Sequence, residues 1–150
     1  MTEGDQPHPG VSDPQERKPV YPQSAVLPFR KAKARTEVLL VTNNSGKRWI
    51  LPKGLVEEDL TPAVSALAEA YEEAGVEGRI ASGCVGIYEY EKWGGICRVQ
   101  VFLMHVERQL ADWPEAGLRQ RRWVSMREAR GMVDDRIPSR LVDTLAASLP

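Results

Sequence analysis

Three carboxylates, Glu69, Glu72 and Glu73, fall close together in a segment that the sequence predicts to be a helix. Residues three and four apart on a helix are neighbours, with about 5–6 Å between their Cβ atoms, so Glu69 would lie beside both of the others. Each like-charged pair costs about 0.2–0.5 kcal/mol, and the negative C-terminal end of the helix dipole adds to that cost. A hard divalent cation such as Mg²⁺, which prefers oxygen ligands, would relieve both effects. The alternative is an ordinary solvated acidic face.

The chain just before this helix is basic. It carries seven lysines and arginines against one glutamate, Glu37, in a protein of formal net charge -1: Arg30, Lys31, Lys33, Arg35, Lys47, Arg48 and Lys53. Acidic metal ligands beside basic residues suit a phosphate-bearing substrate that binds together with Mg²⁺. The candidates for phosphate contacts are Arg30, Lys47, Arg48 and Lys53. For each of them the alternative is a plain exposed surface position.

Local signals indicate where the glutamate helix begins and ends. Thr61 can cap it, Pro62 suits its first position, and Gly75 can supply the left-handed residue that ends it. One apolar stripe recurs at helical spacing, and we expect it to pack on the core with the glutamates turned away from it: Val64, Leu67, Ala68 and Tyr71.

Apolar or alternating segments between turn residues predict the strands. The predicted strands are residues 24–29, 36–43, 48–52, 79–92, 96–109 and 119–126, and a turn at Trp93-Gly94-Gly95 joins two of them. Residues 126–133 and 138–149 have helical patterns. Because strands and helices intermix without a regular alternation of strand and crossover helix, we expect a mixed sheet between helices.

Composition limits the class of protein. The chain has 150 residues, 42% hydrophobic and 27% charged, which suits one domain. We divide it into a disordered tail over residues 1–20, rich in Pro, Gly and charge, and a domain over residues 21–150. The small net charge argues against general nucleic-acid or membrane-surface binding, and the N-terminus lacks the apolar segment of a secretory signal. We therefore expect a cytoplasmic monomer or homodimer with a small-molecule substrate, and no membrane or stable nucleic-acid partner.

The two cysteines, Cys84 and Cys97, carry no sign of a disulfide or a zinc site. The expected hairpin pairs Cys97 near Lys92, far from Cys84 and beyond the reach of a disulfide. The sequence has no CxxC pair and only two histidines, so zinc binding is not expected. We expect both cysteines to be small buried core residues.

The stretch from Gly54 to Val76 resembles the Nudix box, whose pattern is G, five residues, E, seven residues, and then R-E-U-x-E-E-x-G-U, with U an aliphatic residue. Gly54, the three glutamates, Gly75 and Val76 fall at the required spacings, and Ala70 takes the first U position. Further segments are similar to the diphosphoinositol polyphosphate phosphohydrolase branch of the superfamily: LPKG, GIYEYEK, CRVQVF, WPE and RRWVSMREA. The resemblance covers roughly residues 24–150.

This resemblance implies an α/β fold, the Nudix α/β/α sandwich with a mixed sheet. It also implies metal-dependent hydrolysis of a phosphoanhydride in a nucleoside-diphosphate derivative, a dinucleoside polyphosphate or an inositol pyrophosphate. By the same resemblance, Glu69, Glu72 and Glu73 would be catalytic. Glu69 and Glu73 would hold Mg²⁺ or Mn²⁺ together with the Gly54 carbonyl, and Glu72 would bind the metal through water or support the other two. The general base is either Glu69 or a carboxylate outside the box.

Two positions depart from the Nudix pattern. Leu60 stands at its first glutamate, and Ala68 stands at its arginine, which in family members is thought to orient the glutamates. Because both charges are absent together, neither leaves an unpaired partner, and the fold should tolerate the change. If another basic residue fills the role, Arg48 and Arg98 are the candidates. The alternative function is a Nudix-fold module that binds a phosphorylated ligand but turns it over poorly.

Overall fold

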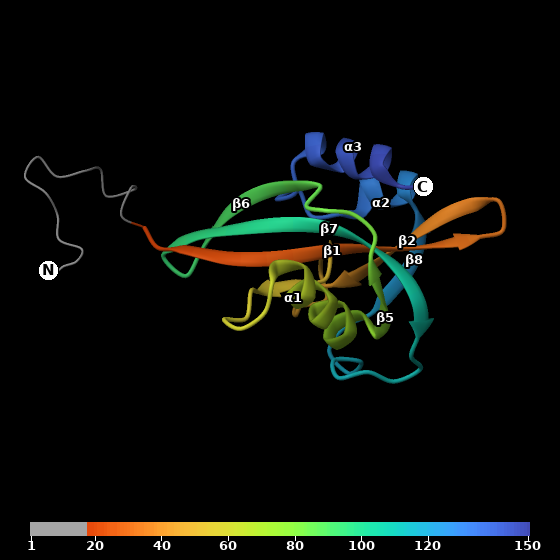
Figure 1. Cartoon of the computed structure of the whole chain (residues 1–150), viewed down its shortest axis with the longest axis horizontal. Helices are drawn as coiled ribbons and strands as arrows, with labels where there is room; N and C mark the ends of the chain where they lie inside the picture. Colours follow the sequence, from red (N-terminus) through yellow and green to blue (C-terminus); the bar gives the residue numbers. More distant parts are fainter. Residues whose placement is uncertain (1–17) are drawn as a thin grey trace, which may run out of the picture.

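The computed structural model describes residues 18–150, and most of the tail predicted for residues 1–20 lies outside them. The described chain forms an eight-stranded mixed sheet with helices on both faces (Figure 1), which confirms the predicted fold class. None of the helices in this range has the length and apolar character that crossing a membrane requires. The elements are β1 (Val20–Ala32), β2 (Arg35–Thr42), β3 (Trp49–Ile50), β4 (Lys53–Leu55), α1 (Pro62–Glu69), a π-helical turn (Ala70–Ala74), β5 (Val76–Ile80), β6 (Gly86–Lys92), β7 (Gly95–Gln109), β8 (Arg121–Ser125), α2 (Met126–Met132) and α3 (Ser139–Ser148).

The two longest strands, β1 and β7, lie side by side and run parallel. All other neighbours are antiparallel: β1 with β2 and β4, β7 with β5 and β6, and β2 with β3 and β8. The pairing of β4 with β1 places Lys53 opposite Ala25 and Gly54 opposite Ser24. The lysine-glycine pair that precedes the glutamate helix is therefore held against the middle of the sheet.

Side chains of the central strands alternate between two cores, as the period of a strand requires. Along β1, Ala25, Leu27 and Phe29 belong to the core beneath α2 and α3. Val26 points to the opposite face and belongs to the core beneath α1. Figure 1 shows α1 on one side of the sheet and α2 with α3 on the other. The glutamate helix thus covers one face of the sheet by itself.

The glutamate helix begins and ends where the sequence predicts. The Thr61 hydroxyl accepts a hydrogen bond from the Val64 N–H at 3.2 Å, and Pro62 is the first helical residue. A cap of this kind contributes about 1 kcal/mol to stability. Gly75 ends the helix in the left-handed region, with φ of 66°. The last turn, Ala70–Ala74, is π-helical, a local widening that recurs at functional sites in proteins.

The face that this helix buries is not the predicted one. Val64 is 47% exposed and Tyr71 40% exposed, so two residues of the expected apolar stripe face outward, whereas Leu67 is half-buried against the core. The face that packs on the sheet consists of small residues at a period of four: Ala66, Ala70 and Ala74. Side chains this small let the helix lie close to the sheet. The same rotation turns Glu73 inward, whereas the sequence predicted all three glutamates to face away from the core.

The strand predictions are confirmed except in two regions. Lys53 and Gly54, predicted as a loop, belong to the short strand β4, which pairs with β1. Residues 79–92, predicted as one strand, form two strands, β5 and β6, which both pair with β7. The hairpin between β6 and β7 turns at Trp93 and Gly94, whose φ angles are 55° and 69°. Positive φ at both central residues is typical of a type I′ hairpin turn, which suits the twist of the flanking strands.

The two cysteines have different environments. Cys97 is buried, as predicted, but it pairs with Tyr90 rather than near Lys92. Cys84 is exposed between β5 and β6, and its thiol donates to the Gly86 carbonyl at 3.2 Å. The prediction that Cys84 belongs to the core was therefore wrong, because the segment it occupies leaves the sheet. Both thiols are free.

Candidate active site

The three glutamates of the helix occupy three different environments. Glu73 is buried, with 6% of its surface exposed, Glu69 is half-buried, and Glu72 is exposed. Consecutive residues on a helix point about 100° apart, so turning Glu73 toward the sheet leaves Glu72 facing solvent. The backbone N–H of Lys53 donates to Glu73 Oε1 at 3.2 Å. Gly54, the next residue, lies against the Glu69 carboxyl group with no room for a Cβ between them.

Burial changes the acidity of the two inner carboxyl groups. It raises the pKa of Glu73 to about 8, although the nearby Arg119 guanidinium acts in the opposite direction. Burial also raises the pKa of Glu69, and repulsion from the Glu72 carboxylate adds to that shift. Glu115, on the loop after β7, raises both pKa values further. A cation placed among these groups would relieve the repulsion and displace their protons.

This set of oxygen donors fits a hard divalent metal ion. Glu69 and Glu73 are the adjacent inner pair, and Glu72 and Glu115 lie at its edge. Within residues 18–150, no three acidic, histidine or cysteine side chains already converge closely enough to enclose a metal ion. The inner pair could therefore hold a metal first, with water and the two outer carboxylates completing its coordination. Water commonly fills several positions around Mg²⁺ in proteins.

The loop between β7 and β8 supplies a buried cation to this cluster. Arg119 lies 3.4 Å from Glu73, measured from Nη2 to Oε2, and only 9% of its side chain is exposed. Its Nε donates to Glu115 Oε1 at 2.6 Å, and its Nη1 donates to the Thr42 carbonyl at 2.8 Å. The guanidinium therefore joins the helix, the loop and the end of β2. From the sequence, Glu115 was included only within the WPE segment of the family resemblance, and no role was predicted for Arg119.

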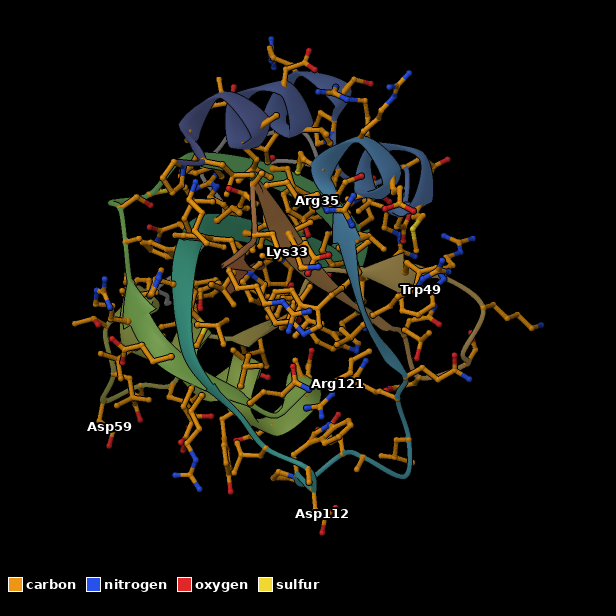
Figure 2. All side chains as sticks on the ribbon, turned by 90° about the vertical axis from the view of Figure 1, so that its right-hand side faces the viewer. Lys33, Arg35, Trp49, Asp59, Asp112 and Arg121 are labelled. Atoms are coloured by element: carbon orange, nitrogen blue, oxygen red, sulfur yellow. The ribbon has the colours of Figure 1, made fainter. Side chains whose placement is uncertain are left out.

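The same loop also covers the C-terminal end of the helix, whose last carbonyls have no partners within the helix. The Glu115 N–H donates to the Glu72 carbonyl at 3.0 Å, and the Trp113 indole donates to the Glu73 carbonyl at 3.0 Å. Arg121 donates to the Ala74 carbonyl at 2.9 Å, and its guanidinium stacks 3.8 Å from the Trp113 ring centre. Figure 2 shows Arg121 at the start of β8, above the loop that carries Asp112. Cations at this end of a helix also complement its dipole.

A cavity of about 420 Å³ opens beside the carboxyl cluster. Lys53 and Arg119 line it, and both contact Glu73. Of the described residues that line it, Asp134 is the one carboxylate, whereas five are cationic: Arg48, Lys53, Lys92, Arg119 and Arg136. Its walls also include the stacked rings of Tyr88 and Tyr90. Its size is within the usual range for a small-molecule site, and its charge favours an anion.

Lys53 is held in place inside this cavity. Its Nζ donates to the Tyr90 hydroxyl at 2.8 Å, and that hydroxyl donates to the buried Gln23 side chain at 2.8 Å. Burial lowers the pKa of the Lys53 ammonium group, and repulsion from Lys92 adds to the effect. A phosphate group would stabilise the charged form of this lysine, because an opposite charge offsets the cost of burial.

Comparisons with known proteins identify the family of the chain. A family model described as the NUDIX domain matches residues 21–144. The chain belongs to the Nudix family. Nudix hydrolase 16, mitochondrial, of Arabidopsis thaliana is 36% identical over 101 residues, which cover 62% of this chain and 56% of that relative. Diphosphoinositol polyphosphate phosphohydrolase 3-alpha of Mus musculus is 34% identical over 110 residues, 71% of this chain and 65% of that relative. The resemblance to the Nudix superfamily is confirmed, and so is the similarity to its diphosphoinositol polyphosphate phosphohydrolase branch.

A solved structure of another protein has a similar fold. The crystal structure of an Ap4A hydrolase from C. elegans superimposes with a TM-score of 0.70 at 22% identity, over 87% of this chain and 99% of that one. At that identity the likeness concerns the fold alone. The chain spans only about half to two thirds of the length of the curated relatives described above.

The four candidate phosphate contacts of this Nudix chain separate into two pairs. Arg48 and Lys53 line the cavity. Arg30 does not: it pairs with Glu37 at 2.9 Å and lies 4.1 Å from the Trp123 ring centre. It is also five residues along β1 from the partner of Lys53, roughly 16 Å at about 3.3 Å per residue. Lys47 is exposed and does not line the cavity. The prediction missed Lys92 and Arg136, which approach from distant parts of the chain.

The two cations that the sequence suggested in place of the Nudix-box arginine pair with other carboxylates. Arg48 pairs with Asp134 at 3.5 Å, and Arg98 pairs with Glu89 at 2.6 Å on the β6–β7 hairpin. Neither arginine pairs with Glu69, Glu72 or Glu73. Leu60 and Ala68, the two departures from the pattern, are half-buried side chains. Arg119 is the cation found beside Glu73. Two features of the sequence could have pointed to this pair: the WPE segment that contains Glu115, and the opposite charges of Glu115 and Arg119, four residues apart.

Proposed function

We propose that this chain is a metal-dependent hydrolase that cleaves a phosphoanhydride bond in a small molecule carrying several phosphates. The observation that carries the proposal is the position of the Glu69–Glu73 carboxyl pair beside a cavity lined with lysine and arginine. Lys53 and Arg119 connect the two, because both contact Glu73 and both line the cavity. An oxygen-ligand metal site and a phosphate-binding cavity that share residues are the two parts that such a reaction needs.

Glu69 and Glu73 would hold Mg²⁺ or Mn²⁺, with the Gly54 carbonyl as a further ligand and Glu72 acting through water. When bound, the metal would lower the pKa of a coordinated water and neutralise charge on the cleaved phosphate. Burial keeps the pKa of Glu73 and of Glu69 high, so these groups would lose their protons as the metal binds.

The general base is either Glu69 or a carboxylate outside the Nudix box, and Glu115 is the one that lies against the cluster. Burial raises the pKa of Glu69, and a base whose pKa is raised toward neutral pH accepts a proton from water efficiently. Glu115 is anchored by Arg119, at 2.6 Å from Nε to Oε1. Glu115 therefore joins Glu69, Glu72 and Glu73 as a candidate catalytic residue.

The cavity favours a densely phosphorylated substrate. Arg48, Lys53, Lys92 and Arg136 can contact phosphates on one side of the cleaved bond while the carboxyl cluster holds the metal on the other. Inositol pyrophosphates and dinucleoside polyphosphates carry enough phosphate to engage several of these cations. Nucleoside-diphosphate derivatives carry fewer. The relatives named above include a diphosphoinositol polyphosphate phosphohydrolase, and the solved structure of similar fold is that of an Ap4A hydrolase.

The test is a hydrolysis panel of inositol pyrophosphates, dinucleoside polyphosphates and nucleotide-sugars, with Mg²⁺ and with Mn²⁺. We expect turnover of at least one compound from the first two classes and slower turnover of nucleotide-sugars. Turnover of nucleotide-sugars alone would contradict the proposed substrate class. If no compound is hydrolysed while one binds tightly, the alternative function, a binding module, is correct. The cytoplasmic location and the monomeric or homodimeric state stay predictions.

A further inference from the structure

Arg119 and the neighbouring Arg121 contact the same helix end in different ways. Arg119 lies near the end of the loop after β7, Arg121 is the first residue of β8, and both residues are half-buried. Arg121 donates only to backbone carbonyls, those of Ala74, Gly75 and Leu110. Arg119 instead pairs with two carboxylates, Glu73 and Glu115. One arginine therefore holds the backbone of the helix end, and the other holds side chains of the carboxyl cluster.

The geometry around Arg119 fixes its guanidinium in one orientation. Each of its three nitrogens faces a different group: Nε faces Glu115, Nη1 faces the Thr42 carbonyl, and Nη2 faces Glu73. The backbone beside it is also anchored, because the Thr42 N–H donates to the Gln120 carbonyl and the Gln120 N–H donates to the Thr42 hydroxyl, both at 3.0 Å. A planar group held at three corners keeps its partners at fixed separations, which a lysine ammonium on a flexible stem cannot do.

The helix itself offers no cation for this purpose. Between Pro62 and Ala74 it contains no lysine or arginine, and Ala68 stands at the arginine of the Nudix box. Glu73 is nevertheless buried, and a buried carboxylate needs a partner to stay charged. Arg119 reaches Glu73 from the loop between β7 and β8 rather than from the helix. The charge that the box lacks is thus present in space but comes from a residue that lies far along the chain.

We infer that Arg119 is the positioning residue that orients Glu73 and Glu115 in this chain, in place of an arginine at position 68. This inference rests on the proposed function for its kinetic consequences, but it also has consequences for metal binding that do not depend on turnover. If Arg119 sets the separation of the two carboxylates, its loss weakens metal binding and slows turnover. If Arg119 only stabilises the loop, its loss lowers the melting temperature and leaves metal binding and turnover unchanged.

The experiment compares four variants of the full chain: Arg119→Lys, Arg119→Gln, Arg121→Gln, and Arg119→Gln combined with Ala68→Arg. Mn²⁺ affinity is measured by titrating the metal-free protein. The kcat is measured at saturating substrate and Mg²⁺, and the Tm is measured with a chelator present. Lys and Gln are chosen because they keep hydrogen-bonding capacity at a buried site, where complete truncation of an ion-pair partner can unfold the protein.

We expect Arg119→Gln to weaken Mn²⁺ binding and lower kcat by about tenfold or more, with KM changed much less. Arg119→Lys should recover part of both losses, because it restores the charge without the planar fork. The added arginine at position 68 should restore at least half of the lost Mn²⁺ affinity on a logarithmic scale. Arg121→Gln, the matched control, should lower Tm while it keeps Mn²⁺ affinity within about twofold of wild type.

A folded Arg119→Gln variant with wild-type Mn²⁺ affinity and kcat would overturn the inference. So would an Arg121→Gln variant that loses as much Mn²⁺ affinity as Arg119→Gln, because the effect would then belong to the loop as a whole. If the wild type hydrolyses nothing in the substrate panel, the proposed function fails by itself. The Mn²⁺ titrations of the same variants then decide the role of Arg119 independently.

Discussion

Gly54 and Glu69 are in direct contact across the gap between β4 and α1. A Cβ built on Gly54 would lie 2.8 Å from Glu69 Oε1, a separation that real Cβ atoms essentially never show. The backbone conformation at Gly54 does not itself demand glycine, since its φ lies outside the left-handed region. The glycine is needed because any larger residue would push the Glu69 carboxyl group out of its place beside Glu73.

Gly54→Ala should therefore displace Glu69 while leaving the fold largely intact. We expect kcat to fall by about tenfold or more, because small displacements of a catalytic group cost that much. Mn²⁺ binding should weaken in parallel. The matched control is Gly83→Ala, at a glycine whose added Cβ would meet nothing within 4 Å. Wild-type turnover in a folded Gly54→Ala protein would show that the position of Glu69 does not limit the reaction.

The raised pKa of Glu73 predicts how stability depends on pH. Burial raises the pKa of its carboxyl group from 4.5 to about 8 in the folded protein. Between these values Glu73 carries a proton in the folded state that it lacks in the unfolded state, so the contribution of Glu73 to stability is largest below pH 4.5 and is lost as pH rises through 8. We expect urea unfolding of the metal-free protein to show this decrease, and Glu73→Gln to reduce its slope, because glutamine cannot titrate.

Added Mg²⁺ should act in the opposite direction, because the metal binds the deprotonated carboxylates. A ligand that binds only the folded state stabilises it, so the rise in Tm caused by Mg²⁺ should grow between pH 6 and pH 8. Glu73→Gln should lose most of this rise. The exposed Glu72 provides the comparison, since Glu72→Gln should keep a larger part of the rise than Glu73→Gln does. An undiminished Mg²⁺ effect in Glu73→Gln would remove Glu73 from the metal site.

Lys53 should contribute to substrate binding in proportion to the phosphates present. Lys53→Ala should raise KM more for an inositol pyrophosphate than for a nucleotide-sugar, because it removes a desolvated cation from the cavity wall. Lys47→Ala, at an exposed position outside the cavity, should leave both KM values near wild type. Equal KM changes for the two substrates in Lys53→Ala would indicate a structural role for the lysine.

Local signals in the sequence predicted most of the fold. The cap at Thr61, the left-handed Gly75 and the turn at Trp93 each depend on residues close together in the chain, and each is present. The rotation of the helix was not predictable in the same way. The helix has two sets of residues at helical spacing that could pack on the sheet, the bulky apolar stripe and the alanine stripe. The bulky stripe was predicted to pack inward because it is more hydrophobic. The alanine stripe packs inward because the distance between helix and sheet, and the place of Glu73 between them, are set by tertiary contacts.

The candidate site was predicted only where it is local. The Nudix box carries its own spacing, so Gly54, Glu69 and Glu73 could be found from the sequence. Glu115 and Arg119 follow β7, more than 40 residues after Glu73, and only the fold of the loop brings them to it. Arg30 illustrates the reverse case. It is nearer to Lys53 in sequence than Arg136 is, but an extended strand carries it away from the cavity.

The most direct test of a metal-dependent hydrolase centred on Glu69 and Glu73 is the initial rate of product formation from the best substrate of the panel, measured for wild type and Glu69→Gln. Each protein is assayed with saturating Mg²⁺ and again with excess chelator. We expect wild-type turnover only with Mg²⁺, and a rate about a hundredfold lower in the folded Glu69→Gln variant, as typical for the loss of a catalytic carboxylate. Turnover that persists in chelator, or a Glu69→Gln rate equal to wild type, would contradict the assignment.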